Sequence, residues 1–149
     1  SNTSWFEAQD VGAMRTKVKY EIHLMVENPI TIIAAWKKYV PTTARAIIHA
    51  EMDRQLGSIV DQLHDIYKLE ACIALNPETP LEQEHPLIHQ VEGLTIMGVH
   101  PGHSHSDFLG DFIFQKIKTA REHLPNMPIE IDGGVTHDRL PDFLKAGRC

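Results

Sequence analysis

The stretch PIEIDGG at residues 128–134 alternates apolar and polar residues into a carboxylate, Asp132, and two glycines follow it. Branched residues with a period of two predict a β-strand, and the glycine pair predicts its end. Asp132 is therefore expected at the carboxyl end of a strand, where parallel α/β folds bind their ligands. Gly133 and Gly134 lack a Cβ atom, so their N–H groups can approach an anion such as phosphate closely. Taken alone, Asp-Gly-Gly is equally consistent with a simple tight turn.

A histidine and two methionines take comparable positions in other predicted strands. In KYEIHLMV at 19–26, His23 and Met25 share one face near the end of the strand. Because an imidazole and a carboxylate suit a divalent metal, His23 and Asp132 are candidate metal ligands. Met25 and Met97 would supply polarisable apolar walls beside the metal, and each is equally consistent with an ordinary core residue. A lone strand histidine more often has a structural role, and we assign His49 to that role.

The loop HPGHSHS at residues 100–106 holds three histidines and raises a second metal hypothesis. Its spacing matches no zinc pattern, and no cysteine lies near it. A solvated loop that faces an anionic substrate is the favoured interpretation, with His103, Ser104 and His105 as candidate contacts.

Alternating elements must position these residues. Strands are predicted at 19–26, 46–50, 70–75, 94–99 and 128–132. Helices are predicted at 9–17, at 30–39 with Pro29 opening it, at 54–67, at 109–124 and from 136 or 138 to 146, with part of 81–90 helical. Strand and helix alternate about five times, which predicts a parallel sheet, open or closed into a barrel. In a barrel the carboxyl ends of the strands share one rim, so distant residues become neighbours.

Composition limits the classes of protein to consider. The chain has 149 residues, 42% hydrophobic and 23% charged, which predicts one globular domain over residues 1–149. A net charge of −6 argues against nucleic acid as the main partner. No apolar run is long enough to span a membrane, and the first residues lack the apolar core of a secretion signal. Cys72 lies in an apolar run and is expected to be a reduced core residue, so we expect a cytoplasmic protein.

Five motifs together resemble one enzyme family. EIHLMVENP at 21–29 looks like the third-strand signature of ribulose-phosphate 3-epimerases. IHAE at 48–51 and ALNPETPLE at 74–82 are similar to the fourth- and fifth-strand motifs of that family. MGVHPG at 97–102 and IEIDGG at 129–134 resemble the sixth and seventh. The motifs stand in the family's order and span nearly the whole chain, although residues 1–10 match none of them.

The resemblance implies a (β/α)₈ TIM barrel that interconverts D-ribulose 5-phosphate and D-xylulose 5-phosphate. It implies a divalent metal (Zn, Fe, Mn or Co), a sugar-phosphate substrate and a homo-oligomer. Carried over, His23 and Asp132 are metal ligands that also contact substrate, and Asp132 is one of two acid/base aspartates. Met25 and Met97 would line the C3 carbon, while Gly102, Gly133 and Gly134 would face the phosphate. Inverting a carbon beside a carbonyl needs a base on one face and an acid on the other.

The chain departs from the family pattern in two ways. Ser104 and His105 stand where the family has a glycine pair, and they would either clash with a close phosphate or let His105 bind it as a cation. A full barrel runs to about 200–250 residues, and this chain covers about five consecutive β/α units. The family's first, second and last strands have no counterpart here, nor do two of the four metal ligands and one of the two aspartates. We therefore expect an incomplete barrel that is inactive as a segment.

Two alternatives remain open at the level of sequence. Another ketose-phosphate 3-epimerase, acting on a hexulose 6-phosphate, would share the strand motifs, because loops read the length of the sugar. A non-catalytic sugar-phosphate-binding or scaffold protein would have lost the site. Ser104 and His105 favour this second alternative slightly, whereas the presence of His23 and Asp132 opposes it.

Overall fold

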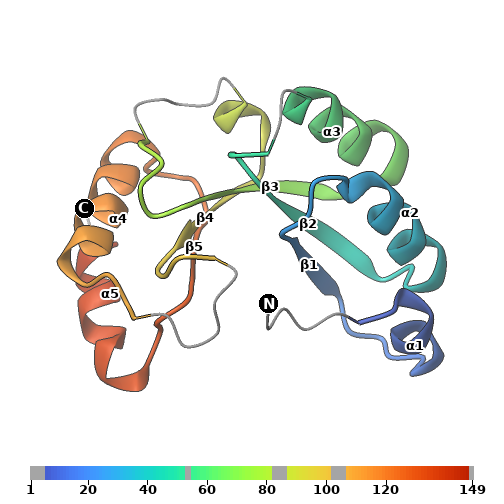
Figure 1. The fold of residues 1–149 in the computed structure, drawn as a ribbon, viewed down its shortest axis with the longest axis horizontal. Helices are drawn as coiled ribbons and strands as arrows, with labels where there is room; N and C mark the ends of the chain where they lie inside the picture. The colour runs from blue at the N-terminus through green and yellow to red at the C-terminus, as the bar shows by residue number, and fades with distance from the viewer. Residues whose placement is uncertain (1–5, 53–54, 82–86, 102–106, 148–149) are drawn as a thin grey trace.

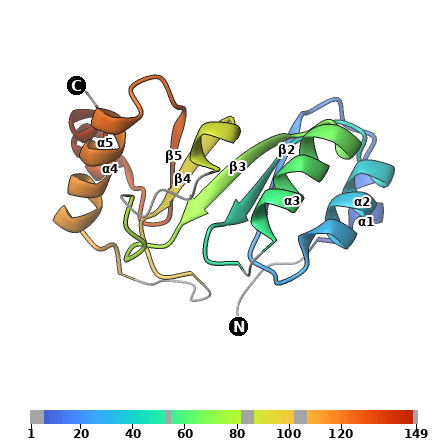
Figure 2. The same ribbon diagram turned by 90° about the horizontal axis from the view of Figure 1, so that it is seen from above.

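A single parallel sheet forms the centre of the computed structural model, which describes residues 6–52, 55–81, 87–101 and 107–147. Its strands follow one another in sequence order, each parallel to the next. They are β1 (Tyr20–Leu24), β2 (Thr43–His49), β3 (Glu70–Leu75), β4 (Gly93–Met97) and β5 (Ile129–Asp132). The strands curl into a half-barrel, as Figures 1 and 2 show, which agrees with a partial TIM barrel and with the expected fold class.

Helices cover the convex side of this half-barrel. In Figure 1, α2 and α3 lie outside one end of the sheet and α4 and α5 outside the other. The helices are α1 (Ala8–Ala13), α2 (Pro29–Tyr39), α3 (Leu56–Gln62), α4 (Asp111–His123) and α5 (Leu140–Ala146), with short 3₁₀ turns at Ile88–Gln90 and His137–Arg139. The convex face of the sheet contributes the main core, because alternate strand residues such as Ile48, Ile73 and Ile96 are almost fully buried against these helices.

The opposite, concave face has a layered composition that positions the site. Strand register places Ile47 beside Cys72, and Met97 beside Asp132. Ile47, Cys72, Ala74 and Met97 form a second, smaller apolar cluster on this face. Cys72 is a free, buried thiol, as the sequence indicates, and burial raises its pKa to about 12. The apolar cluster separates charged residues at the amino ends of the strands from histidines at the carboxyl ends.

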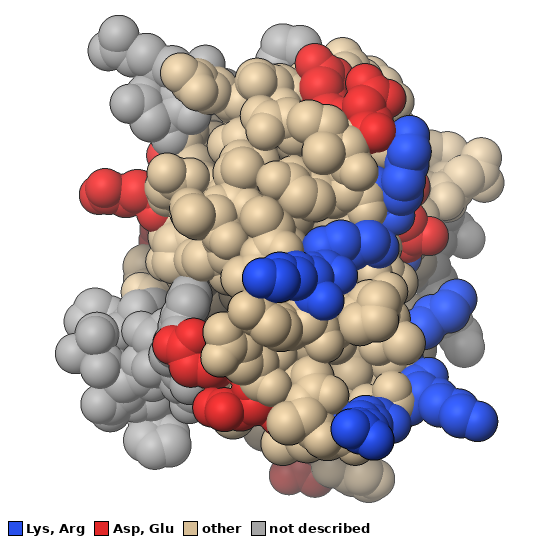
Figure 3. Space-filling view, turned by 90° about the vertical axis from the view of Figure 1, so that its right-hand side faces the viewer, with Lys and Arg blue, Asp and Glu red and all other residues tan. Residues whose placement is uncertain are grey.

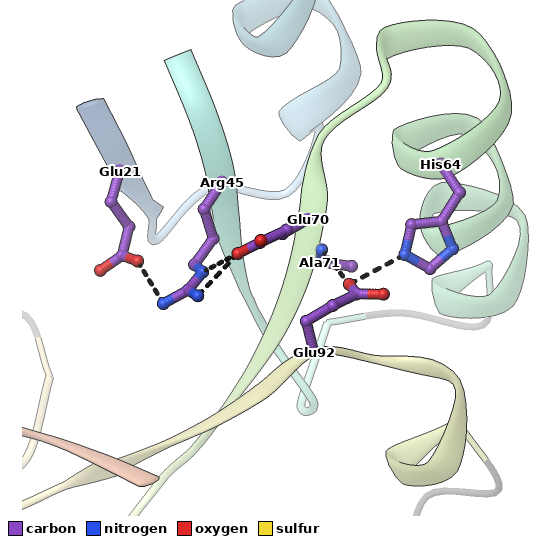
Figure 4. Close-up of polar contacts among 6 residues, drawn as sticks. All are labelled: Glu21, Arg45, His64, Glu70, Ala71 and Glu92. Atoms are coloured by element: carbon purple, nitrogen blue, oxygen red, sulfur yellow. Dashed lines mark hydrogen bonds and ion pairs between the residues drawn. The ribbon is translucent and has the colours of Figure 1, made fainter. Parts of the chain in front are cut away.

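A charged cluster ties the amino ends of the first three strands together (Figure 4). Arg45 of β2 donates from Nη1 to Glu21 of β1 at 2.8 Å and from Nη2 to Glu70 of β3 at 2.6 Å. Beside this cluster, Glu92 accepts a hydrogen bond from the backbone N–H of Ala71 at 2.7 Å, which links the residue just before β4 to β3. These charge-assisted hydrogen bonds link β1, β2 and β3 and the segment before β4 at their amino ends.

Most predicted elements are confirmed, with shifted ends. The helix predicted over 54–67 is α-helical only to Gln62, because a wider π turn at Leu63–Tyr67 follows. Lys68, at a φ of 53°, closes that turn by donating its N–H to the Leu63 carbonyl. In the segment 81–90, the described helical part is the 3₁₀ turn at Ile88–Gln90, and residues 82–86 lie outside the described chain. Pro29 occupies the first turn of α2, as predicted.

The surface outside α1 to α3 carries both signs of charge. Figure 3 shows Lys and Arg side chains gathered toward one side of this face, with Asp and Glu above and below them. None of the helices in the described ranges is long and apolar enough to cross a membrane.

Candidate active site

The curl of the sheet brings its two outermost strands together at the rim. His23 on β1 and Asp132 on β5 face each other, with Nδ1 and Oδ2 2.9 Å apart. Their side chains are 18% and 40% exposed, so the pair borders solvent without being free in it. The contact with His23 lowers the pKa of Asp132, while partial burial acts against that effect. The carboxylate is therefore ionised at neutral pH.

His49 extends this pair, although the sequence pattern assigns it a structural role. It is 7% exposed, and its Nε2 lies 2.9 Å from Nε2 of His23. The planes of the two rings differ by 17°, and their centroids are 5.0 Å apart. Because the centroids are much farther apart than the nitrogens, the rings meet at their edges rather than face to face. The other nitrogen, Nδ1, lies 3.4 Å from Oε2 of Glu51.

Glu51 connects this row of side chains to the loop that follows β3. Its Oε1 accepts the backbone N–H of Asn76 at 2.8 Å and also the Thr79 hydroxyl. Burial would raise the pKa of Glu51, but the hydrogen bonds from His49, Thr79 and Asn76 outweigh it and lower the pKa to about 2. An ionised carboxylate thus lies at one end of a row formed by Glu51, His49, His23 and Asp132.

Lys116 on α4 holds the same loop from its other side. Its Nζ donates to the carbonyls of Asn76 at 2.5 Å, Pro77 at 3.1 Å and Thr79 at 2.7 Å. The side chain is buried, and burial lowers its pKa to about 8 against the pull of Glu51 and Glu78. Satisfying three carbonyls requires all three N–H bonds of the ammonium form. The loop after β3 is therefore held from two sides. The Glu51 carboxylate accepts from its N–H and hydroxyl groups, and the Lys116 ammonium donates to its carbonyls.

A cleft of about 830 Å³ opens beside these residues at the carboxyl ends of the strands. Met25, His49, Glu51 and Asn76 contribute to its lining. Met25 is 39% exposed and forms part of the cleft wall, whereas Met97 is 2% exposed and belongs to the concave apolar cluster. The structure thus separates the two predicted methionines: Met25 lines the cleft, and Met97 is buried on β4 beside Asp132 of β5.

Gly133 and Gly134 are required by the local backbone. Their φ angles are 96° and 69°, which side chains rarely adopt. A Cβ atom on Gly133 would lie 2.4 Å from Val99, and one on Gly134 would lie 2.5 Å from Phe108. These packing constraints account for both glycines, so their predicted contact with phosphate stays a prediction. The other loop candidates, Gly102, His103, Ser104 and His105, lie outside the described residues, and His100 before them contacts Glu78.

With this geometry in place, comparison with known proteins identifies the family. Residues 5–148 match the model of the ribulose-phosphate 3 epimerase family. The chain belongs to the ribulose-phosphate 3-epimerase family. This confirms the resemblance inferred from the five strand motifs.

Several curated ribulose-phosphate 3-epimerases are similar to this family member. The cytoplasmic isoform of Oryza sativa subsp. japonica is 30% identical over 140 residues, which cover 89% of this chain and 58% of the relative. The enzyme of Bacillus subtilis is 28% identical over 142 residues, or 89% and 61%. The enzyme of Aquifex aeolicus is 27% identical over 149 residues, or 97% and 65%. This epimerase-family chain therefore spans about three fifths of the length of these relatives.

The site of this epimerase-family chain offers part of a metal-binding set. In the described ranges no group of three or more His, Cys, Asp or Glu side chains could hold a metal ion. His23 and Asp132 provide an imidazole and a carboxylate 2.9 Å apart, which suits neighbouring positions around one divalent ion. The residues present therefore fit such an ion in type and separation, and its other ligands would be water, substrate or residues outside those described.

Two residues of the site were not singled out from the sequence. Glu51 follows His49 by two positions, a spacing that puts both on one side of an extended chain, and this was the available signal. Lys116 shares the apolar face of α4 with Ile113, Ile117 and Ala120. A lysine on the apolar stripe of a helix is the signal that could have indicated its buried role.

Proposed function

We propose that the protein containing this chain is a ribulose-phosphate 3-epimerase that interconverts D-ribulose 5-phosphate and D-xylulose 5-phosphate. The carrying observation is the 2.9 Å contact between His23 Nδ1 and Asp132 Oδ2 at the rim of the half-barrel. The carboxylate of Asp132 is ionised, and its partner His23 contacts His49, which lines the cleft at the carboxyl ends of the strands. Membership of the family supports the assignment of this site to epimerisation.

In the proposed reaction, Asp132 acts on the proton at C3 of the sugar. Its carboxylate accepts this proton, and the electrons of the broken C–H bond pass into an enediolate. A group on the opposite face then returns a proton to C3, so the configuration inverts and no atoms are gained or lost. In the reverse direction, the protonated Asp132 is the donor. Because Oδ2 faces His23, the other carboxylate oxygen is left for the substrate.

A divalent cation, Zn, Fe, Mn or Co, is proposed to bind at His23 and Asp132. When bound, it would offset the negative charge that develops on the enediolate oxygens. His23 then orients Asp132, and Met25 supplies an apolar wall that excludes water from C3. We also propose a homo-oligomeric protein of the cytoplasm; the similar rice protein is described as a cytoplasmic isoform.

Hydrogen exchange at C3 tests this proposal. The natural protein that contains this chain is incubated in D₂O with D-ribulose 5-phosphate and each metal, and NMR follows both xylulose 5-phosphate and deuterium at C3. Deuterated xylulose 5-phosphate supports the proposal. Binding without exchange would overturn it in favour of a non-catalytic sugar-phosphate-binding protein. A ketohexose 6-phosphate is tested in parallel. If exchange occurs only with that substrate, the protein is instead a 3-epimerase that acts on a hexulose 6-phosphate.

The 149-residue chain by itself is the control in that assay, and we expect it not to turn over. Two of the four metal ligands and one of the two aspartates that the family resemblance implies have no counterpart in its sequence. With one acid/base carboxylate, a proton can be exchanged on only one face of C3, so inversion lacks its second partner.

A further inference from the structure

Two charged side chains hold the backbone of Asn76 from opposite sides. Its N–H donates to Oε1 of Glu51 at 2.8 Å, and its carbonyl accepts from Nζ of Lys116 at 2.5 Å. Glu51 follows the end of β2 and Lys116 belongs to α4, so the two contacts come from separate parts of the fold. Because hydrogen bonds to charged groups are stronger than those between neutral groups, this backbone has little freedom to move.

The burial of Lys116 shows that it does more than fill space. It is 9% exposed and lies on the buried face of α4 with Ile113 and Ile117. An apolar side chain would pack there without the cost of removing an ammonium from water. Nζ instead donates to three carbonyls within residues 76–79, which engages every N–H bond of the ammonium. The lysine therefore fixes the loop after β3 rather than the helix that carries it.

The side chain of Asn76 has an open hydrogen-bonding position at the cleft. Asn76 lines the cleft of about 830 Å³ together with Met25 and His49. Its Oδ1 is buried and has no hydrogen-bond partner among the residues that the structure describes. Nearly all buried polar atoms in proteins have such a partner, so an open acceptor at a cleft wall indicates a contact that a ligand completes. An amide has both donors and an acceptor, which suits the hydroxyl groups of a sugar.

We propose that Asn76 binds a hydroxyl group of the sugar phosphate in the cleft, and that Lys116 is a positioning residue that holds Asn76 there. The identity of the ligand rests on the proposed function, whereas the hold of Lys116 on the loop does not. Asn76 lies outside the pair formed by His23 and Asp132, so its contact with the ligand is the same before and during proton transfer. Removing a contact of that kind raises KM and leaves kcat unchanged.

A double-mutant cycle in the natural protein that contains this chain tests the proposal. It compares the wild type with Lys116→Met, Asn76→Ala and the double variant, since methionine approximates the length of lysine without its charge. Lys118→Met is the matched control, because it removes the same charge from the same helix, where the Lys118 side chain is 62% exposed. The readouts are kcat and KM for D-ribulose 5-phosphate, and the hydrogen exchange of the Asn76 and Thr79 amides, which bond to Glu51 and to the Asn76 carbonyl.

We expect each single variant to raise KM about 10-fold, the usual effect of one lost hydrogen bond, with kcat within about twofold of the wild type. The double variant should have the KM of Asn76→Ala alone, because Lys116 acts through Asn76. The two loop amides should exchange about 10-fold faster in Lys116→Met. Lys118→Met should match the wild type in all of these measurements.

Three kinetic results would overturn the proposal: an unchanged KM in Asn76→Ala, KM effects that multiply in the double variant, or a fall in kcat at constant KM in Lys116→Met. Unchanged exchange of the loop amides in Lys116→Met would overturn the hold of this lysine on the loop. If Lys116→Met does not fold, ¹⁵N spectra of the wild type decide that point, since protons of a held ammonium exchange slowly and those of a free one do not.

A failure of the proposed function would give a different pattern. If the wild type binds D-ribulose 5-phosphate without converting it, epimerisation fails, and dissociation constants of the same proteins replace KM in the cycle. If the wild type does not bind this sugar phosphate, the role of Asn76 is overturned as well, while the exchange of the loop amides still decides the role of Lys116.

Discussion

Asp132, at the end of β5, has two proposed roles: it binds the metal, and it exchanges the proton at C3. Its neighbour His23 favours the ionised form, and the proposed reaction uses that form as a base. We predict that Asp132→Asn lowers C3 exchange by at least about 10²-fold, because an amide neither accepts the proton nor binds metal well. Deuterium incorporation in the natural protein measures this, with circular dichroism to show that the fold persists. A variant that kept most of the wild-type rate would exclude Asp132 as the acid/base.

Glu51 should also make the molecule sensitive to acid. Its pKa is lowered from the ordinary 4.5 to about 2, so its contacts stabilise the fold fully above pH 4.5 and lose that contribution as pH falls toward 2. Glu51 contacts His49, and its charge acts on the ammonium of Lys116. We predict that the free energy of unfolding, measured in urea, falls less steeply between pH 4.5 and 2 in Glu51→Gln than in the wild type. Parallel curves for the two proteins would contradict this.

At the scale of elements, the contact between β3 and β4 depends on one missing side chain. Gly93 pairs in register with Cys72, and a Cβ on Gly93 would lie 2.5 Å from the buried Sγ. We predict that Gly93→Ala lowers the free energy of unfolding by about 1–3 kcal/mol through overpacking. Adding Cys72→Ala removes the sulfur and should recover part of the loss. Urea unfolding of the four proteins measures the coupling, and strictly additive effects would show that the two sites do not compete for space.

At the scale of the whole molecule, the described sheet has two edges. β1 pairs only with β2, and β5 only with β4, within the described residues. Strands with one unpaired side associate readily with other chains, and only barrel closure removes such edges. We predict that the isolated 149-residue chain self-associates as its concentration rises. Light scattering coupled to size exclusion checks this, and a constant monomer mass over a hundredfold range of concentration would refute it.

Local signals in the sequence account for most of the elements. Alternation of apolar residues defines the strands around Ile22 and Ile73, and Pro29 marks the start of α2, because these effects act over a few residues. The sequence pattern did not predict that the α-helix ends at Gln62. The π turn there depends on Lys68 adopting a left-handed conformation and bonding back to Leu63, a choice that helix periodicity does not report.

The sequence by itself thus determined the parallel strand–helix order and the position of His23 and Asp132 at strand carboxyl ends. Only the tertiary structure decided that these two residues meet. They lie on the first and last strands of the sheet, and the curl of all five strands closes that gap to 2.9 Å. The same curl turns His49 from an expected structural residue into the link between His23 and Glu51. Sheet curvature arises from packing and register across the whole molecule, and no local pattern of residues encodes the distance that it produces.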